Sequence, residues 1–195
     1  MAAEHRWPWI SPEGYIVREM ESDTKSEYVD GVIVGVSGAS PEHIRICMNL
    51  TIELAPHVEA SRCTAFASDM RVHLAELNRY YYPDYVVTCS KPEFNIVQGV
   101  KSLLNPHTIV EILSETTERV DRIEKWMAYR QIYSLRSYIL IHQDRALIEI
   151  AEFDPASGVW STVEVSGIDA SMKFSFPDYE LPLSALYRNV ELGEA

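Results

Sequence analysis

The stretches Tyr80-Tyr-Tyr-Pro-Asp-Tyr-Val-Val87 and Ile109-Val-Glu-Ile-Leu113 each place one acidic residue in a run of apolar, β-forming residues. A carboxylate buried among such residues is costly unless a cation or a hydrogen-bond donor compensates it. Asp84 and Glu111 therefore indicate a functional site, and a divalent metal ion is the simplest compensating group.

The segment around Glu111 is predicted to form a βαβ unit. Residues 108–113 have the pattern of a short buried strand, residues 117–133 that of a helix, and residues 138–141 that of a second buried strand. Because such units are right-handed, the start of the helix is expected near the carboxyl end of the first strand.

One face of the predicted helix carries Asp121, Lys125 and Tyr129, which are spaced four residues apart. Lys125 is therefore expected to point back over the sheet toward Glu111. Asp84, Glu111 and Lys125 can then meet in space.

The remaining chain alternates between helix and strand signals. We expect helices over residues 12–21 and 41–56, a hairpin of residues 26–29 and 32–36 around Asp30-Gly31, strands over 62–74 and 80–88, an irregular connection over 89–106, and antiparallel strands over 146–151, 159–165 and 172–176. The expected apolar stripe of the second helix comprises Ile44, Cys47, Met48 and residues 50–54. The fold class is therefore α/β or α+β, with a mixed sheet flanked by helices and extra antiparallel strands at the C-terminus.

Length and composition indicate one domain. The 195 residues are 47% hydrophobic, which predicts a single domain over residues 1–195 with its core at about 24–152. The net charge of −12 opposes long-range attraction to a polyanion, so a nucleic-acid contact would need a local basic surface or metal ions.

No apolar stretch approaches the roughly 20 residues of a membrane span, and the N-terminus lacks the apolar core of a signal peptide. We expect a cytoplasmic protein with no membrane partner.

The three cysteines, Cys47, Cys63 and Cys89, are an odd number and widely spaced. This pattern predicts neither a disulfide framework nor a zinc site, so we expect three reduced thiols.

Two carboxylates that converge on a hard cation, with a lysine beside them, suit phosphodiester hydrolysis. A divalent ion polarises a phosphoryl oxygen and acidifies a water, while lysine steadies the nucleophile or the charge of the transition state. Each residue also has an ordinary interpretation. Asp84 can be an exposed turn acid after Pro83, and Lys125 a surface lysine paired with Asp121 or Glu124.

Seven segments between Glu27 and Ile141 carry a further signal through their order and spacing. They are Glu27-Tyr-Val-Asp-Gly31, Ser40-Pro-Glu-His43, Phe66-Ala-Ser-Asp-Met-Arg-Val72, Tyr81-Tyr-Pro-Asp84, Val110-Glu-Ile-Leu-Ser114, Asp121-Arg-Ile-Glu-Lys125 and Tyr138-Ile-Leu-Ile141. Together they resemble the PD-(D/E)XK nuclease superfamily and, in detail, its Uma family of restriction endonucleases.

The resemblance implies a restriction-endonuclease-like fold and a Mg²⁺ or Mn²⁺ site at Asp84 and Glu111. The chain departs from the superfamily pattern at Leu113, where a lysine is usual two residues after the glutamate. The resemblance implies that this lysine has moved to the next helix, as Lys125.

Further acids and a histidine are candidate auxiliary residues. Glu27 and His43 fall on family motifs, and His43 lies near a helix N-terminus, where it can hydrogen-bond a phosphate. Asp121 is either an auxiliary residue or the partner of the lysine. Asp69 belongs either to the site or to contacts with backbone amides or Arg71.

These observations predict a metal-dependent endonuclease that acts on DNA. A homodimer is expected, because cutting both strands of a duplex generally requires two sites. One alternative is a non-catalytic interaction module that retains the nuclease fold, which the acidic total charge favours. Another is an α/β protein that binds a small ligand in the same cleft.

Overall fold

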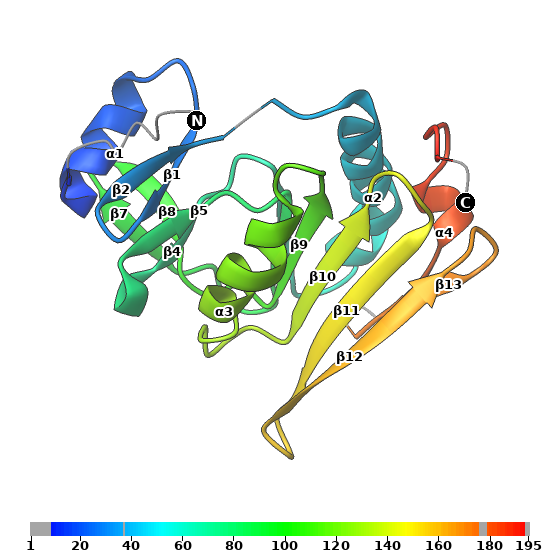
Figure 1. The fold of residues 1–195 in the computed structure, drawn as a ribbon. Helices are drawn as coiled ribbons and strands as arrows, with labels where there is room; N and C mark the ends of the chain where they lie inside the picture. The colour runs from blue at the N-terminus through cyan, green and yellow to red at the C-terminus, as the bar shows by residue number, and fades with distance from the viewer. Residues whose placement is uncertain (1–8, 37, 176–178, 194–195) are drawn as a thin grey trace.

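Two six-stranded sheets form the body of the molecule in the computed structural model, which describes residues 9–36, 38–175 and 179–193 (Figure 1). Sheet A has the order β2 (Val32–Gly35), β1 (Ser26–Val29), β5 (Arg79–Tyr81), β4 (Val72–Leu74), β8 (Val100–Leu103) and β7 (Phe94–Val97). Sheet B has the order β12 (Val159–Ser166), β11 (Leu147–Asp154), β10 (Ser137–His142), β9 (Thr108–Leu113), β6 (Tyr85–Thr88) and β3 (Thr64–Ala67). A small sheet pairs β13 (Ser171–Phe174) with β14 (Tyr179–Pro182).

The helical elements are short apart from α1 (Pro12–Glu21) and α2 (Pro41–Glu59). The short helical elements are the 3₁₀-helix η1 (Ala75–Leu77), the π-helix η2 (Val120–Lys125), α3 (Trp126–Tyr129) and α4 (Leu183–Leu186). The α+β fold class with mixed sheets is confirmed, although the strands form two large sheets rather than one.

The first helix and hairpin form where the sequence predicts them. The Ser11 side chain caps α1 by accepting a hydrogen bond from the Gly14 N–H at 3.1 Å. Asp30 and Gly31 connect β1 to β2 with φ values of 50° and 93°, a left-handed conformation that favours glycine. α1 packs on sheet A through the fully buried Tyr15.

The centre of sheet B confirms the predicted βαβ unit. β9 and β10 are parallel, with η2 and α3 between them in sequence, and β6 pairs antiparallel with β9 on its other side. Leu50 of α2 belongs to the same apolar cluster as Val110, whereas Tyr129 of α3 belongs to the same cluster as Ile109. Opposite faces of β9 therefore enter two different cores.

Two predicted strands are each two strands in different sheets. Residues 62–74 form β3 in sheet B and β4 in sheet A, with a break at Ser68, whose φ is 27°. Residues 80–88 form β5 in sheet A and β6 in sheet B, and the break falls at Pro83, which has no N–H to donate to a strand ladder. The prediction was wrong because an apolar pattern reports burial and not the sheet to which a strand belongs.

α2 continues to Glu59, past the predicted end near Pro56. A proline inside a helix removes the hydrogen bond to the carbonyl four residues earlier, here that of Ile52. Ile52 and Pro56 are both exposed, so water can solvate the freed carbonyl.

The buried side of α2 also differs from the predicted stripe. Ile44 and Met48 are 54% and 43% exposed. The buried residues of α2 are Ile46, Asn49, Leu50, Leu54 and Val58. α2 carries apolar residues on more than one side, so the spacing did not identify the face that meets the sheet.

The connection predicted as irregular over residues 89–106 contains the β7–β8 hairpin. Gln98 and Gly99 form its turn with φ values of 53° and 83°. β7 is an edge strand whose side chains are partly exposed. Its sequence therefore lacks the strict apolar alternation that would have identified it as a strand.

Cys63 and Cys89 form a disulfide, and Cys47 is a free cysteine, so the expectation of three reduced thiols was wrong. β3 pairs with β6 so that Thr64 lies opposite Thr88. Cys63 directly precedes Thr64 and Cys89 directly follows Thr88, so the antiparallel pairing brings their Cα atoms to 4.0 Å. The pairing of these strands, which the cysteine spacing does not reveal, creates the bond.

Two further elements differ from expectation at their ends. The helix predicted over residues 117–133 ends at Tyr129, and its first part is the π-helix η2. β13 ends at Phe174, and residue 176 of the predicted strand lies outside the described residues. Within the described ranges, no helix is both long and apolar enough to cross a membrane.

The burial of α2 gives a stability prediction. Leu50→Ala should lower the free energy of unfolding by about 2–5 kcal/mol, because it removes fully buried methyl groups. Ile52→Ala on the same helix, where the side chain is 51% exposed, should cost less than about 1 kcal/mol. Urea unfolding followed by circular dichroism measures both, and equal losses would contradict the observed orientation of α2.

Candidate active site

Asp84 lies in the segment that carries the chain from sheet A to sheet B, directly before β6. Its Oδ1 is 2.8 Å from His43 Nε2, and its Oδ2 accepts a hydrogen bond from the Ile112 backbone N–H at 2.7 Å. The side chain is 19% exposed. Two directed contacts thus orient this carboxylate while it remains accessible from solvent.

Glu111 projects from the same face of sheet B as Asp84. Tyr85, the first residue of β6, lies opposite Val110, and extending this antiparallel register by one residue brings Asp84 opposite Glu111. Two observations agree with this position: the Ile112 N–H donates to Asp84, and the charge of Asp84 contributes to the raised pKa of Glu111. Opposite residues of antiparallel strands point to the same side of the sheet. The two acids therefore have the arrangement that a shared site requires.

The π-helix η2 brings Lys125 to Glu111. Lys125 Nζ lies 3.2 Å from Glu111 Oε1 and 3.1 Å from Asp121 Oδ1. The lysine is 7% exposed, so it is not the ordinary surface residue of the alternative interpretation. π-helical turns inside helices are frequent at functional sites.

Sheet A contributes Glu27 to the same cluster. Glu27 Oε1 lies 3.2 Å from Lys125 Nζ and accepts a hydrogen bond from the Tyr82 backbone N–H at 3.0 Å. The six predicted site residues are therefore brought together: Glu27, His43, Asp84, Glu111, Asp121 and Lys125. Asp69 is not among them, because its side chain is 75% exposed and forms an ion pair with Lys25.

Two buried tyrosines complete the cluster and were not predicted as site residues. The Tyr129 hydroxyl donates to Glu111 Oε1 at 3.2 Å, and the Tyr138 hydroxyl donates to the Asp121 carbonyl at 2.9 Å. Burial raises the pKa of both tyrosines well above the usual range, so both remain hydrogen-bond donors. The four-residue spacing from Lys125 was the available signal for Tyr129.

The cluster carries more negative than positive charge. Burial raises the pKa of Glu111, the charge of Lys125 opposes this shift, and the neighbouring carboxylates add to it. Burial alone would lower the pKa of Lys125, but the charges of Glu111, Glu27 and Asp121 outweigh it and raise that pKa. The site therefore keeps its lysine protonated and still favours additional positive charge.

The donor set suits a hard divalent cation. Mg²⁺ prefers oxygen ligands, keeps several waters, and is usually bound through one or two carboxylates together with substrate phosphates. Asp84 and Glu111 supply two carboxylates on one face. Within the described residues, no group of three or more His, Cys, Asp or Glu side chains is arranged to hold a metal ion.

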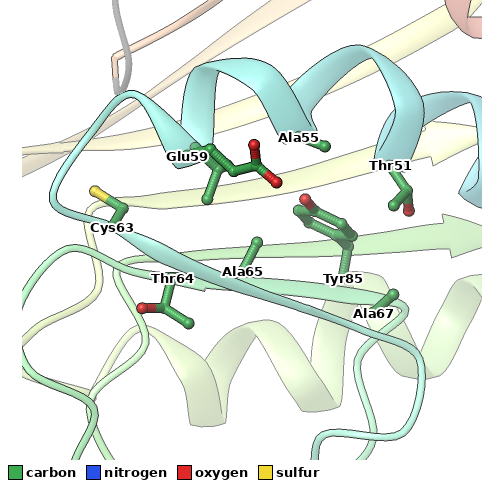
Figure 2. Close-up of a pocket in the computed structure, with 9 residues that line it drawn as sticks. Thr51, Ala55, Glu59, Cys63, Thr64, Ala65, Ala67 and Tyr85 are labelled. Carbon is green, nitrogen blue, oxygen red and sulfur yellow. The ribbon is translucent and has the colours of Figure 1, made fainter.

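A pocket of about 330 Å³ lies elsewhere, between α2 and β3 (Figure 2). Tyr85 lines it from β6, with Ala55 and Glu59 on α2. Tyr85 follows Asp84 in the chain but belongs to the apolar cluster on the α2 side of sheet B. None of the six site residues lines this pocket, which is therefore separate from the acidic cluster.

Arg122 attaches η2 to sheet B. Its guanidinium donates to Glu149 Oε2 on β11 at 2.6 Å and to Glu118 Oε1 at 2.7 Å. The hydrogen bond from Arg122 lowers the pKa of Glu149 to about 2. This ion pair fixes the helical segment that carries Lys125.

The two mixed sheets with an acidic cluster between them place the protein in the restriction-endonuclease-like fold class. A crystal structure of a "putative nuclease belonging to DUF820" from Anabaena variabilis shares this fold with a TM-score of 0.71 and 17% identity, over 91% of this chain and 97% of that chain. The family model described as "Putative restriction endonuclease" (Uma2) matches residues 12–184. The chain belongs to the Uma2 family.

Two relatives come from Synechocystis sp. (strain ATCC 27184 / PCC 6803 / Kazusa). "Uncharacterized protein sll1609" is 33% identical over 162 residues, covering 83% of this chain and 90% of that protein. "Uncharacterized protein slr1290" is 30% identical over 144 residues, covering 74% of each.

The Arg122–Glu149 ion pair gives a pH prediction. The pKa of Glu149 falls from 4.5 to about 2 on folding, so its stabilisation is fully present above pH 4.5 and is lost as the pH falls toward 2. Glu149→Gln should cost about 2 kcal/mol at pH 7, and the difference from wild type should shrink at pH 3. Urea unfolding at both pH values tests this, with Glu152→Gln on the same strand as the control. A difference that does not depend on pH would refute the role of the ion pair.

Proposed function

We propose that the protein is a metal-dependent endonuclease that hydrolyses phosphodiester bonds in DNA. The observation that carries this proposal is the convergence of Asp84 and Glu111 on one face of sheet B, with the Lys125 ammonium 3.2 Å from Glu111. The description of the Uma2 family as "Putative restriction endonuclease" supports the same reaction.

Asp84 and Glu111 would hold Mg²⁺ or Mn²⁺. When bound, such an ion supplies polarisation of a phosphoryl oxygen and a more acidic water. His43 Nε2 and the Ile112 N–H orient Asp84, at 2.8 and 2.7 Å. Orientation of this kind places the reacting groups before substrate arrives and avoids reorganisation during the reaction.

Lys125 and Tyr129 both contact Oε1 of Glu111, at 3.2 Å each. Both contacts are made to the same oxygen, so Oε2 of Glu111 takes part in neither and would be the metal ligand in the proposed site. In the proposed reaction, the positive charge of Lys125 would stabilise the negative charge that develops when a phosphate bound at Glu111 is attacked.

Because the total charge of −12 opposes long-range attraction to DNA, the proposed DNA contact would have to be compact and made through the bound ion. The described residues of one chain form one candidate catalytic cluster, so cutting both strands of a duplex would need two chains. A homodimer is therefore part of the proposal.

Cleavage of plasmid DNA tests the proposed reaction. Supercoiled DNA should be nicked with Mg²⁺ or Mn²⁺ and not with EDTA, and Asp84→Asn and Glu111→Gln should each lower the rate by about 100-fold or more, because each removes a charged ligand. Asp69→Asn changes an exposed acid outside the cluster and should retain the wild-type rate.

The alternative functions give different outcomes in the same assay. Metal binding without cleavage of supercoiled, linear or single-stranded DNA would refute the nuclease and support an interaction module. Equal nicking by wild type and Glu111→Gln would show that a contaminant is responsible. Melting shifts with small ligands that do not depend on metal would support a small-ligand protein.

A further inference from the structure

Lys125 occupies the space between three of the four clustered carboxylates. Its Nζ lies 3.2 Å from Glu27 Oε1, 3.2 Å from Glu111 Oε1 and 3.1 Å from Asp121 Oδ1. Asp84 has different partners, His43 and the Ile112 N–H. The cluster is therefore divided into a part held by the ammonium and a part that faces solvent.

The lysine is fixed in this position by its surroundings. It is 7% exposed, and its ammonium also lies 5.8 Å from the centre of the Tyr81 ring. A buried ammonium with three carboxylate partners cannot leave them without a large loss of electrostatic energy.

Asp121 points to a cation position in the same place. Asp121 is 2% exposed, and the Lys125 ammonium, 3.1 Å away, is the one partner of its Oδ1 among the described residues. A buried carboxylate oxygen whose one partner is an ammonium would be left uncompensated if that charge were removed. The position between Glu27, Glu111 and Asp121 therefore requires a cation of some kind.

Two-metal phosphodiesterases place their ions about 3.5–4 Å apart, so that carboxylates bridge or flank both ions. In this protein, a second ion beside one at Asp84 and Glu111 would need Glu27 and Asp121 as ligands. The Lys125 ammonium already has these partners.

We propose that the positively charged side chain of Lys125 occupies the position of a second metal ion and so restricts the site to one divalent ion. Removing this charge opens a second ion position at Glu27 and Asp121. The inference rests on the proposed function in that it takes Asp84 and Glu111 as the ligands of the first ion. It adds an explanation of how many divalent ions the site binds.

Mn²⁺ titration of the full chain, followed by calorimetry and by electron paramagnetic resonance of free Mn²⁺, tests the inference without an activity assay. Wild type should bind one Mn²⁺ per chain, and Lys125→Met should bind two. Lys125→Arg keeps the charge and should bind one. Adding Glu27→Gln to Lys125→Met should weaken the second ion by about 10–100-fold.

A second comparison does not depend on the folding of Lys125→Met. Because Glu27 serves the lysine and not the first ion, Glu27→Gln alone should leave one Mn²⁺ bound with an affinity within about threefold of wild type, whereas Glu111→Gln should weaken it at least tenfold. Loss of the ion in Glu27→Gln would overturn the inference.

The remaining outcomes separate this inference from the proposed function. Two Mn²⁺ ions per wild-type chain, or one ion in a folded Lys125→Met variant, would overturn the inference and leave the nuclease proposal intact. A wild-type chain that binds no Mn²⁺ would overturn both.

Discussion

The contact of one ammonium with carboxylates from both sheets is the constraint on which the structure depends. Glu27 comes from sheet A, Glu111 from sheet B, and Asp121 from the π-helix that also carries Lys125. Burying a charge costs several kcal/mol, and removing one partner of a buried pair costs about 3–5 kcal/mol because the other charge is left uncompensated. Such a cluster is therefore weak evidence of stabilisation. The surrounding fold holds this cluster in place through the Arg122–Glu149 ion pair and the buried tyrosines, and its cost is consistent with the function proposed above.

The main residues of the site could be predicted because their chemistry conflicts with their surroundings. An acid inside an apolar strand, as at Glu111, is visible in the sequence as a cost that something must compensate. Lys125 was found through helix spacing, and the observed π-helix still leaves it close enough to contact both Glu111 and Asp121. Tyr138 could not be assigned in the same way, because a tyrosine in a buried strand is an ordinary core residue whose hydroxyl partner depends on the fold.

The parts of the fold that were predicted wrongly depend on which segments pair. The apolar alternation around Pro83 correctly predicted strands. The passage from one sheet to the other at Pro83, however, follows from the pairing of β5 with β1 and β4, and of β6 with β9 and β3. The Cys63–Cys89 bond has the same origin in the β3–β6 register. Spacing along the chain contains little information about such long-range neighbours.

The passage of the chain at Pro83 has a consequence for how the molecule unfolds. Val72 and Tyr81 of sheet A share one apolar cluster with Val86 and Ile109 of sheet B, so the sheets have a common core. Neither sheet can lose its structure without exposing apolar surface of the other and separating Glu27 from Lys125. The two sheets therefore behave as one cooperative unit, and a ligand that binds only at their junction would raise the melting temperature of the entire chain.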